Sequence, residues 1–307
     1  MTTPLDPFAL DRRSIRAAFD RAGPSYDAAA VLQTRVRAEL LSRLDLVRME
    51  PAVVLDLGTG TGQGAQALKR RYRSATVFAL DAASGMLRQA RRRSGWLRPL
   101  HLVCADALRL PFADGSVDLI FSSLMLQWCD DLDTVLREMR RVLAPGGFAA
   151  LATLGPDTLK ELRAAWAAAD TGADAATGAA ARRSDAHVLG FRDMHDIGDA
   201  LGRSGFLEPV LDVEHLTLTY QGVRDLTADL KSLGAHNAAA ARPRGLTGKN
   251  RWRAMTAAYE EFRRDGRLPA SYEVVYGAAW AGEPRHAASV VDGEVRVPIG
   301  SIRRASR

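Results

Sequence analysis

Between residues 52 and 154, short apolar runs alternate with segments whose apolar residues recur at helical spacing. Continuous apolar strands separated by amphipathic helices predict a parallel sheet covered on both faces. Right-handed crossovers then produce a doubly wound α/β sheet, with its ligand crevice at the carboxyl ends of the strands. The runs are AVVLDL, ATVFALD, LHLVCAD, VDLIFSSL and FAALATL, which begin at residues 52, 75, 100, 117 and 148.

The flanking segments predict helices before the sheet and a looser order after it. Residues 12–46 read as two helices, and Gly23-Pro24 is expected to separate them. After Gly155 we expect a helix that runs into a mobile Ala-rich linker at 167–181. A strand at 209–220, helices at 223–233 and 251–263 and a strand at 271–280 then follow. We predict three parts: 1–46, a main domain at 47–280 with a helical insertion at about 222–268, and a flexible tail at 281–307.

Composition places the chain among ordinary globular proteins, with 47% hydrophobic and 25% charged residues. It contains no apolar run of 18 residues and no apolar segment behind a basic start, so we expect neither a membrane span nor a secretory signal. The two cysteines, Cys104 and Cys129, make no disulfide framework, and we expect them to be small apolar core residues. The expected location is the cytoplasm.

The net charge is +6, and almost all of the positive charge comes from arginine. A basic surface favours an acidic partner, either nucleic acid or an acidic carrier protein. Because no arginine run is interleaved with aromatic residues, the chain lacks the sequence pattern of a nucleic-acid platform. The charge alone does not choose between an acidic carrier and a solvated surface without a partner.

The motif DLGTGTG, Asp56 to Gly62, joins the first apolar run to a helix. Glycines there let the backbone turn tightly and approach a ligand. Dinucleotide-binding folds use a related turn, so the motif alone is weak evidence. Asp56 beside the turn would repel a pyrophosphate, whereas an amino-acid-bearing sulfonium tolerates a carboxylate. We expect cofactor contacts from Asp56, Leu57, Gly58, Thr59, Gly60 and Gly62.

Two further aspartates end the next two apolar runs. Asp81 stands 25 residues after Asp56, where a carboxylate can accept from both hydroxyls of a ribose. Asp106 can accept from an adenine amino group. The alternative for each aspartate is a helix N-cap or a solvated strand end. The remaining predicted cofactor contacts are Ala82, Met86, Ala107, Ser122 and Gln127.

The motifs DLGTGTG, CADALRLPFADGSVDLIFSSLMLQW and LREMRRVLAPGG, together with Asp81, resemble those of class I S-adenosylmethionine methyltransferases over about residues 50–155. The resemblance implies a Rossmann-like, mostly parallel seven-stranded sheet and S-adenosylmethionine as cofactor. Many methyl acceptors share this core, so the resemblance does not identify the substrate.

The flanks FDRAGPSYDAAAVLQTR, ATLGPDTLKELRAAW, LKSLGAHN and RLPASYEVVYGAAW resemble the malonyl-acyl-carrier-protein O-methyltransferase (BioC) family of biotin synthesis over nearly the whole chain. The resemblance implies that residues 1–46 form a helical lid. It also implies that the enzyme methylates the free carboxylate of a malonyl thioester on acyl carrier protein. The alternatives are a methyltransferase of another small acid or quinone precursor, an arginine-hydroxylating assembly factor on the same fold, and a protein that binds S-adenosylmethionine without chemistry.

Methyl transfer to a carboxylate requires little from the protein. The acceptor oxygen must lie in line with the methyl and the sulfur, and a carboxylate is already ionised near neutral pH. No general base is therefore expected, and the site needs a dry pocket with hydroxyl or arginine donors at the lid. Tyr26 in the implied lid is the first candidate. Gln127 and Trp128 follow the fourth apolar run at the crevice.

The resemblance also implies an arginine that pairs with the malonyl carboxylate, just before a phenylalanine. Here Gly190 stands at that position, before Phe191. Arg192 and Arg163 are the candidates to replace it, although Arg163 also fits an ordinary helix surface. The histidines are too scattered in sequence for a metal site, so we predict no metal.

Overall fold

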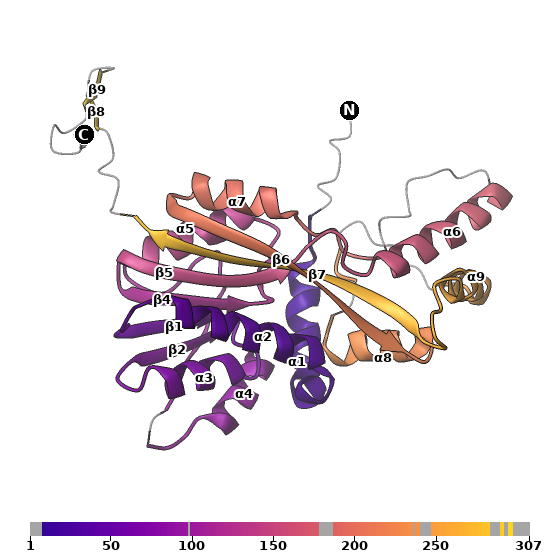
Figure 1. Cartoon of the computed structure of the whole chain (residues 1–307), viewed down its shortest axis with the longest axis horizontal. Coiled ribbons are helices and arrows are strands. Elements are labelled where there is room, and N and C mark those ends of the chain that lie inside the picture. The colour runs from indigo at the N-terminus through magenta and orange to yellow at the C-terminus, as the bar shows by residue number, and fades with distance from the viewer. Residues whose placement is uncertain are drawn as a thin grey trace.

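The computed structural model describes residues 8–97, 99–177, 187–235, 237–239, 247–282, 289–291 and 294–296. Its centre is a seven-stranded sheet in the order β3-β2-β1-β4-β5-β7-β6, in which β7 runs antiparallel to both of its neighbours and the other neighbouring strands are parallel (Figure 1). The predicted doubly wound, mostly parallel sheet is therefore confirmed. The strands are β1 (Val53–Leu57), β2 (Thr76–Asp81), β3 (His101–Cys104), β4 (Val117–Ser123), β5 (Leu143–Leu154), β6 (Phe206–Tyr220) and β7 (Leu268–Ala281).

Helices cover both faces of the sheet, as its two-sided apolar strands require. One core cluster joins the sheet to α2 and α3, and a second joins it to α5 and α7. In β1, Val54 belongs to the first cluster and its neighbour Leu55 to the second, because successive strand residues point to opposite faces. The helices are α1 (Arg12–Ala29), α2 (Val31–Arg43), η1 (Leu44–Leu46), α3 (Gln63–Arg71), α4 (Ser84–Arg93), η2 (Leu126–Trp128), α5 (Leu132–Val142), α6 (Lys160–Thr177), α7 (Met194–Arg203), α8 (Val223–Ser232) and α9 (Lys249–Glu260).

The first helix does not end where the sequence predicts. It continues through Gly23-Pro24, and the break falls at Ala30. At Gly23 the helix crosses α4 at close range, since a Cβ there would lie 3.0 Å from the carbonyl oxygen of Gly85. This tertiary contact supports the helix against the missing N–H of Pro24. The expectation of a break at Gly23-Pro24 was wrong, because packing against α4 outweighs the tendency of glycine and proline to interrupt a helix.

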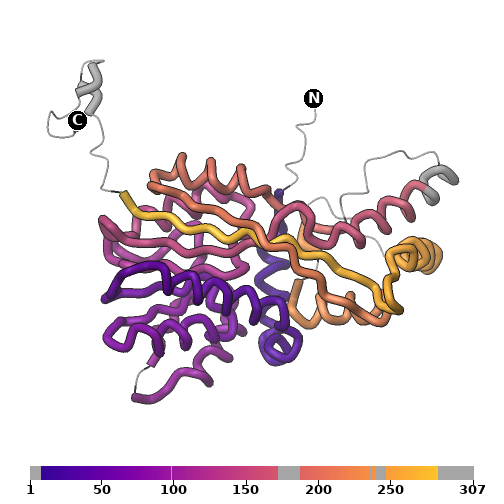
Figure 2. The backbone as a smooth tube through the Cα atoms, viewed as in Figure 1, coloured from indigo at the N-terminus to yellow at the C-terminus, as the bar shows by residue number. Residues whose placement is uncertain are grey.

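Strands β6 and β7 are the longest of the sheet and extend past the other strands (Figures 1 and 2). Helices α6, α8 and α9 gather at this extension (Figure 1). Helices α8 and α9 both lie between β6 and β7 in the chain, within the stretch expected to be an insertion. The extended ends of β6 and β7 thus carry a second group of helices beside the other five strands.

The structure describes only parts of the expected linker and of the expected tail. Helix α6 continues to Thr177, into the stretch expected to be a linker, and residues 178–186 lie outside the described part. Within the expected tail, β8 (Ser289–Val291) pairs with β9 (Glu294–Arg296), and the rest lies outside the described residues. None of the described helices combines the length and apolar character that crossing a membrane requires.

Candidate active site

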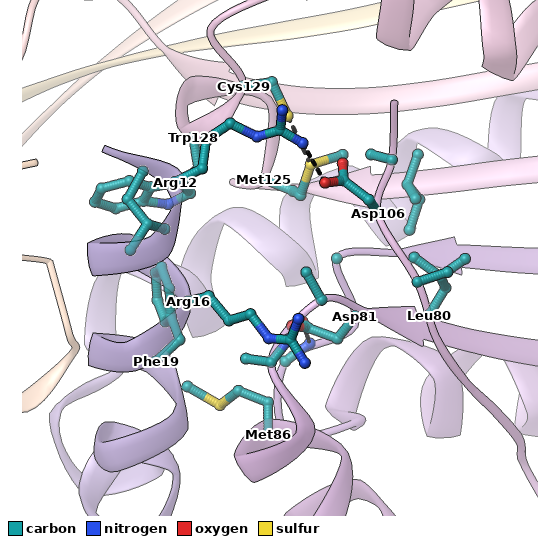
Figure 3. Close-up of a pocket in the computed structure, with 18 of the residues that line it drawn as sticks. Arg12, Arg16, Phe19, Leu80, Asp81, Met86, Asp106, Met125, Trp128 and Cys129 are labelled. Carbon is teal, nitrogen blue, oxygen red and sulfur yellow. Dashed lines mark hydrogen bonds and ion pairs between the residues drawn. The ribbon is translucent and has the colours of Figure 1, made fainter. Parts of the chain in front are cut away.

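A cavity of about 610 Å³ lies over the carboxyl ends of β1, β2 and β4, where the strand order reverses direction, and helix α1 forms its outer wall (Figure 3). This volume suits a ligand of cofactor size. The sequence-predicted residues that line it are Tyr26, Leu57, Gly58, Gly60, Asp81, Ala82, Met86, Asp106 and Ala107. The structure therefore brings together residues that are up to 81 positions apart in the chain, from Tyr26 to Ala107.

The glycine turn forms the floor of this cavity. Gly58, Gly60 and Gly62 all have left-handed φ angles, of 78°, 55° and 83°. A Cβ on Gly58 would lie 2.3 Å from the side chain of Met125, and one on Gly62 would lie 2.8 Å from Ala90. A Cβ on Gly60 would meet no atom of the described chain within 4 Å, although Gly60 lines the cavity. Gly58 and Gly62 therefore serve packing, and Gly60 leaves room on the ligand side.

Asp81 connects the end of β2 to this turn. Its Oδ2 accepts a hydrogen bond from the backbone N–H of Gly60 at 2.9 Å, and its Oδ1 accepts one from that of Ala83 at 2.8 Å. Burial raises the pKa of Asp81, and the two backbone N–H groups oppose this rise. The carboxylate is thus fixed in orientation on the cavity wall.

Asp56 lies beneath the turn, outside the cavity lining. Its side chain is 2% exposed, and its Oδ2 accepts a hydrogen bond from the Thr59 hydroxyl at 2.6 Å. Burial raises the pKa of Asp56 to about 6, against the hydrogen bonds from Thr59 and the backbone of Ala65. Asp56 thus supports the turn from below, and Thr59 and Gly62 also stand outside the lining.

Asp106 faces helix α1 across the mouth of the cavity. It forms an ion pair with Arg12, and Arg16 extends from the same helix towards Asp81 (Figure 3). Sequence reasoning did not select these arginines. Arg12, Arg16 and Phe19 recur at helical spacing on the face that meets the cavity, and basic residues on an otherwise apolar face were the available signal.

Tyr26 lines the cavity near the end of α1, and the next residue attaches this helix to the glycine turn. Burial raises the pKa of Tyr26, and the negative charge of Asp81 raises it further, so its hydroxyl stays protonated. Asp27 accepts hydrogen bonds from the Thr61 hydroxyl and the Gln63 amide, both at 2.7 Å, and pairs with Arg93. Helix α1 is thus fastened to the sheet beside the cavity.

Arg37 is a residue that the sequence reasoning missed. It donates to the Gln63 side chain at 2.5 Å, and burial lowers its pKa while Asp56, Tyr26 and Asp27 raise it. It is a partly buried cation directed at the acidic groups around the turn. Its position on α2 resembled that of an ordinary surface arginine, so the sequence carried no signal for it.

A second, smaller cavity of about 130 Å³ adjoins the first, and Leu124 and Trp128 line both. The predicted contact Gln127 lines this second cavity. Ser122 has no exposed surface and no hydrogen-bond partner for its hydroxyl in the described chain, whereas Ser123 lines the first cavity. The other walls come from the α1–α2 junction, α6, α8 and the extension of β6 and β7.

The two candidate arginines hold backbone carbonyl groups. Arg163 donates to the carbonyl oxygens of Pro156 at 2.9 Å and Thr158 at 3.3 Å. Arg192 donates to the carbonyl oxygen of Asp130 at 3.1 Å, and its guanidinium lies 4.2 Å from the ring centre of Phe8. Neither arginine lines the first two cavities, so their assignment to a substrate carboxylate stays a prediction.

Two other expectations concern metal and cysteine. The carboxylates of Asp157 and Glu273 lie with the ring of His215 so that one ligand atom from each falls within 4.8 Å of the others. These carboxylates already bind protein donors, since Asp157 pairs with Lys160 and Glu273 accepts from the backbone of Asp157. Cys104 is exposed at the cavity, so its interpretation as a core residue was wrong.

The sheet order, the glycine turn and the acidic strand end define a class I methyltransferase. The Methyltransferase domain family model matches residues 55–151. Among solved structures, the fold is similar to that of the YcgJ protein from Bacillus subtilis, with a TM-score of 0.54, 16% identity and coverage of 80% of this chain and 98% of that one. It is also similar to the [4+2]-cyclase SpnF, with a TM-score of 0.50, 20% identity and coverage of 81% and 86%.

Curated relatives identify the family. Malonyl-[acyl-carrier protein] O-methyltransferases are 51% identical in Laribacter hongkongensis, over 94% of this chain and 95% of that protein, and 49% identical in Methylovorus sp., over 91% and 92%. The protein of that name in Halorhodospira halophila is 48% identical over 99% of both chains. The chain belongs to the malonyl-[acyl-carrier protein] O-methyltransferase family.

Proposed function

We propose that this enzyme transfers a methyl group from S-adenosylmethionine to the free carboxylate of a malonyl thioester carried by acyl carrier protein, in biotin synthesis. The relatives of 48–51% identity carry the name of this reaction. The structural observation that supports it is the pair of adjoining cavities with Leu124 and Trp128 in their shared wall. A donor and an acceptor can therefore meet at one boundary.

The larger cavity fits the cofactor. S-adenosylmethionine supplies a methyl group that its positive sulfur makes electrophilic. Gly60 leaves space where a Cβ would project into the cavity, and the half-buried Asp81 on the cavity wall can present its carboxylate to ribose hydroxyls. Asp106 can accept from the adenine amino group, with Met86 and Ala107 as apolar walls. In this proposal the amino-acid end faces the glycine turn, and Arg37 lies outside the lining of both cavities.

The chain's own residues then have two tasks at the acceptor. Apolar side chains exclude water, notably Phe19 and Trp128, whose rings meet edge to face at 5.2 Å between centroids. Tyr26 keeps its proton and can donate a hydrogen bond without removing charge from the reacting oxygen. A malonyl carboxylate is ionised at neutral pH, so no proton has to be removed from it. In this proposal residues 1–46 act as the lid.

The test is to mix purified chain with S-adenosylmethionine labelled in the methyl group and malonyl-acyl carrier protein. We expect a labelled methyl ester on the carrier that base releases. Equal turnover of free malonate would favour the small-acid alternative. Absence of transfer by folded protein that binds the cofactor would overturn the proposal.

A further inference from the structure

We propose that the second cavity binds the acyl group of the acceptor and that the Gln33 carboxamide positions its carboxylate. This inference rests on the proposed function and adds the residue that recognises the substrate. The cavity borders the first cavity, which is the proposed methyl-donor site and is called the donor cavity below, at Leu124 and Trp128. An acyl group inside the second cavity therefore ends beside the methyl donor. Its volume of about 130 Å³ is much smaller than the 610 Å³ of the first cavity, which suits a short acyl group.

Gln33 lines this cavity, and its side-chain oxygen lacks a hydrogen-bond partner among the described residues. It lies in the first turn of α2, and its Oε1 is out of contact with solvent and has no hydrogen-bond partner in the described chain. Buried polar atoms without a partner are rare in folded proteins and call for an explanation. Because a half turn exchanges the oxygen and nitrogen of a carboxamide, Gln33 can present either an acceptor or two N–H donors to a ligand.

A second carboxamide stands at the wall next to the donor cavity. Gln127 donates from Nε2 to the carbonyl oxygen of Leu124 at 2.8 Å, and its Oε1 accepts from the Thr153 hydroxyl at 3.2 Å. These bonds fix which end of the amide is the donor. An amide nitrogen has a second N–H, so Gln127 can bind the same carboxylate that Gln33 positions.

The charges around the cavity agree with recognition by neutral donors. Among the described residues that line it, none is lysine or arginine. Burial lowers the pKa of His187, which hydrogen bonds to Asp170 at 3.1 Å, so its ring is neutral near pH 7. Amide donors orient a carboxylate while leaving its charge available for attack, and a guanidinium would hold that charge in an ion pair.

Asp229 sets the direction in which the acyl group enters. This residue of α8 lines the second cavity and accepts a hydrogen bond from Tyr220 at 2.8 Å. A carboxylate repels the malonyl carboxylate and accepts from amide N–H groups, such as those of a carrier's thioester arm. The malonyl carboxylate therefore lies at the Trp128 wall, and the arm lies towards α8.

The backbone supports a functional role for this cavity. Leu124 and Leu159 both line it, and both have a φ of 55°, which leucine rarely adopts. Their N–H groups donate to Ala152 at 2.8 Å and Ser271 at 2.7 Å. Strained residues held by hydrogen bonds cluster at binding sites. The cavity wall is thus held in a shape that local preferences would not select.

The experiment compares Gln33→Met, which keeps length and volume without the amide, and Gln33→Glu, which adds a charge. Gln221→Glu is the control, because Gln221 is exposed and lies outside the lining of both cavities. Steady-state kinetics with malonyl-acyl carrier protein gives KM, and competition by acetyl-acyl carrier protein measures acyl binding without a carboxylate. Calorimetry with S-adenosylmethionine monitors the donor site and the fold.

We expect the KM for the malonyl carrier to rise about tenfold or more in Gln33→Met and further in Gln33→Glu. Cofactor affinity and inhibition by the acetyl carrier should stay as in the wild type. Unchanged KM, or equal weakening of both carriers, would overturn the assignment of Gln33 while wild-type methylation still supports the proposed function. If Gln33→Met does not bind cofactor, Gln33→Asn provides the same comparison with a retracted amide.

Discussion

The backbone N–H of Gly60 donates to the Asp81 carboxylate across 2.9 Å, which joins the loop after β1 to the end of β2. The link holds the turn at the height where Gly60 faces the cavity. Because the other oxygen of Asp81 accepts from Ala83, both oxygens are oriented by the chain itself. One carboxylate thus shapes the turn and, in the proposed function, also binds the ribose.

Replacing Asp81 with asparagine should weaken cofactor binding. The asparagine amide retains one acceptor oxygen but turns an N–H₂ group towards a backbone N–H. The hydrogen bond that holds the turn and the contact with the ribose are therefore both weakened. We expect the Kd for S-adenosylmethionine to rise at least tenfold, from the loss of about 1.5–3 kcal/mol for a charged hydrogen bond. Calorimetry measures this, with Asp114→Asn as control, since Asp114 lies on an exposed loop. An unchanged Kd would remove Asp81 from the site.

Tyr26→Phe should lower kcat for methyl transfer about tenfold, because it removes a hydrogen-bond donor at the wall of the cavity. Burial raises the pKa of Tyr26, so the wild-type rate should show no loss from tyrosine ionisation up to about pH 9. The measurement is kcat against pH for both proteins. Tyr72→Phe is the matched control, since Tyr72 lies outside the lining of both cavities. Equal rates for Tyr26→Phe and wild type would exclude the role.

Asp56 should make stability depend on pH between about 4 and 6. Burial raises its pKa from 3.8 to about 6, so the native state holds the proton more tightly than the unfolded chain. The resulting stabilisation is complete below the unfolded pKa and is lost as the pH rises through about 6. Relative to Asp56→Asn, the wild type should lose about 3 kcal/mol of unfolding free energy between about pH 3 and pH 7.

Urea denaturation of both proteins across this pH range gives the difference directly. Taking the difference cancels the contributions of other titrating groups. A wild type that gains stability over Asp56→Asn as the pH rises would contradict the buried position of this carboxyl.

Asp27→Ala should loosen helix α1 from the glycine turn. The carboxylate accepts from Thr61 and Gln63 and pairs with Arg93, and its side chain is 32% exposed. Solvent screening reduces such interactions, so we expect a loss of about 1–2 kcal/mol in unfolding free energy. Denaturant titration measures it, and Asp45→Ala, which breaks a more exposed pair with Arg71, should lose less. Equal losses in the two variants would contradict a fastening role for Asp27.

The alternation of apolar strands and helices predicted the sheet, and the acidic strand ends predicted the cavity residues Asp81 and Asp106. Other features depended on tertiary structure. Helix α1 passes Pro24 because α4 supports it. Ser123 and not Ser122 faces the cavity, and composition does not reveal the strand register that decides this.

Gln33 was not selected because a glutamine in a helix usually faces solvent. Only the approach of α6, α8 and the β6–β7 extension encloses it. The surroundings of Gln33 are therefore formed by segments far away in the chain, and the local sequence around residue 33 does not predict its burial.

In the proposed function, the long strands β6 and β7 place the acceptor site in a later part of the chain than the methyl-donor site. The donor cavity is lined by residues 12–129, whereas the second cavity also draws on residues 154–272, through α6, α8 and the overhanging ends of β6 and β7. Substitutions in the later segment can thus accumulate during evolution while the earlier segment stays unchanged. A homologue with different residues at the extended ends of β6 and β7 would keep its cofactor and methylate a different substrate.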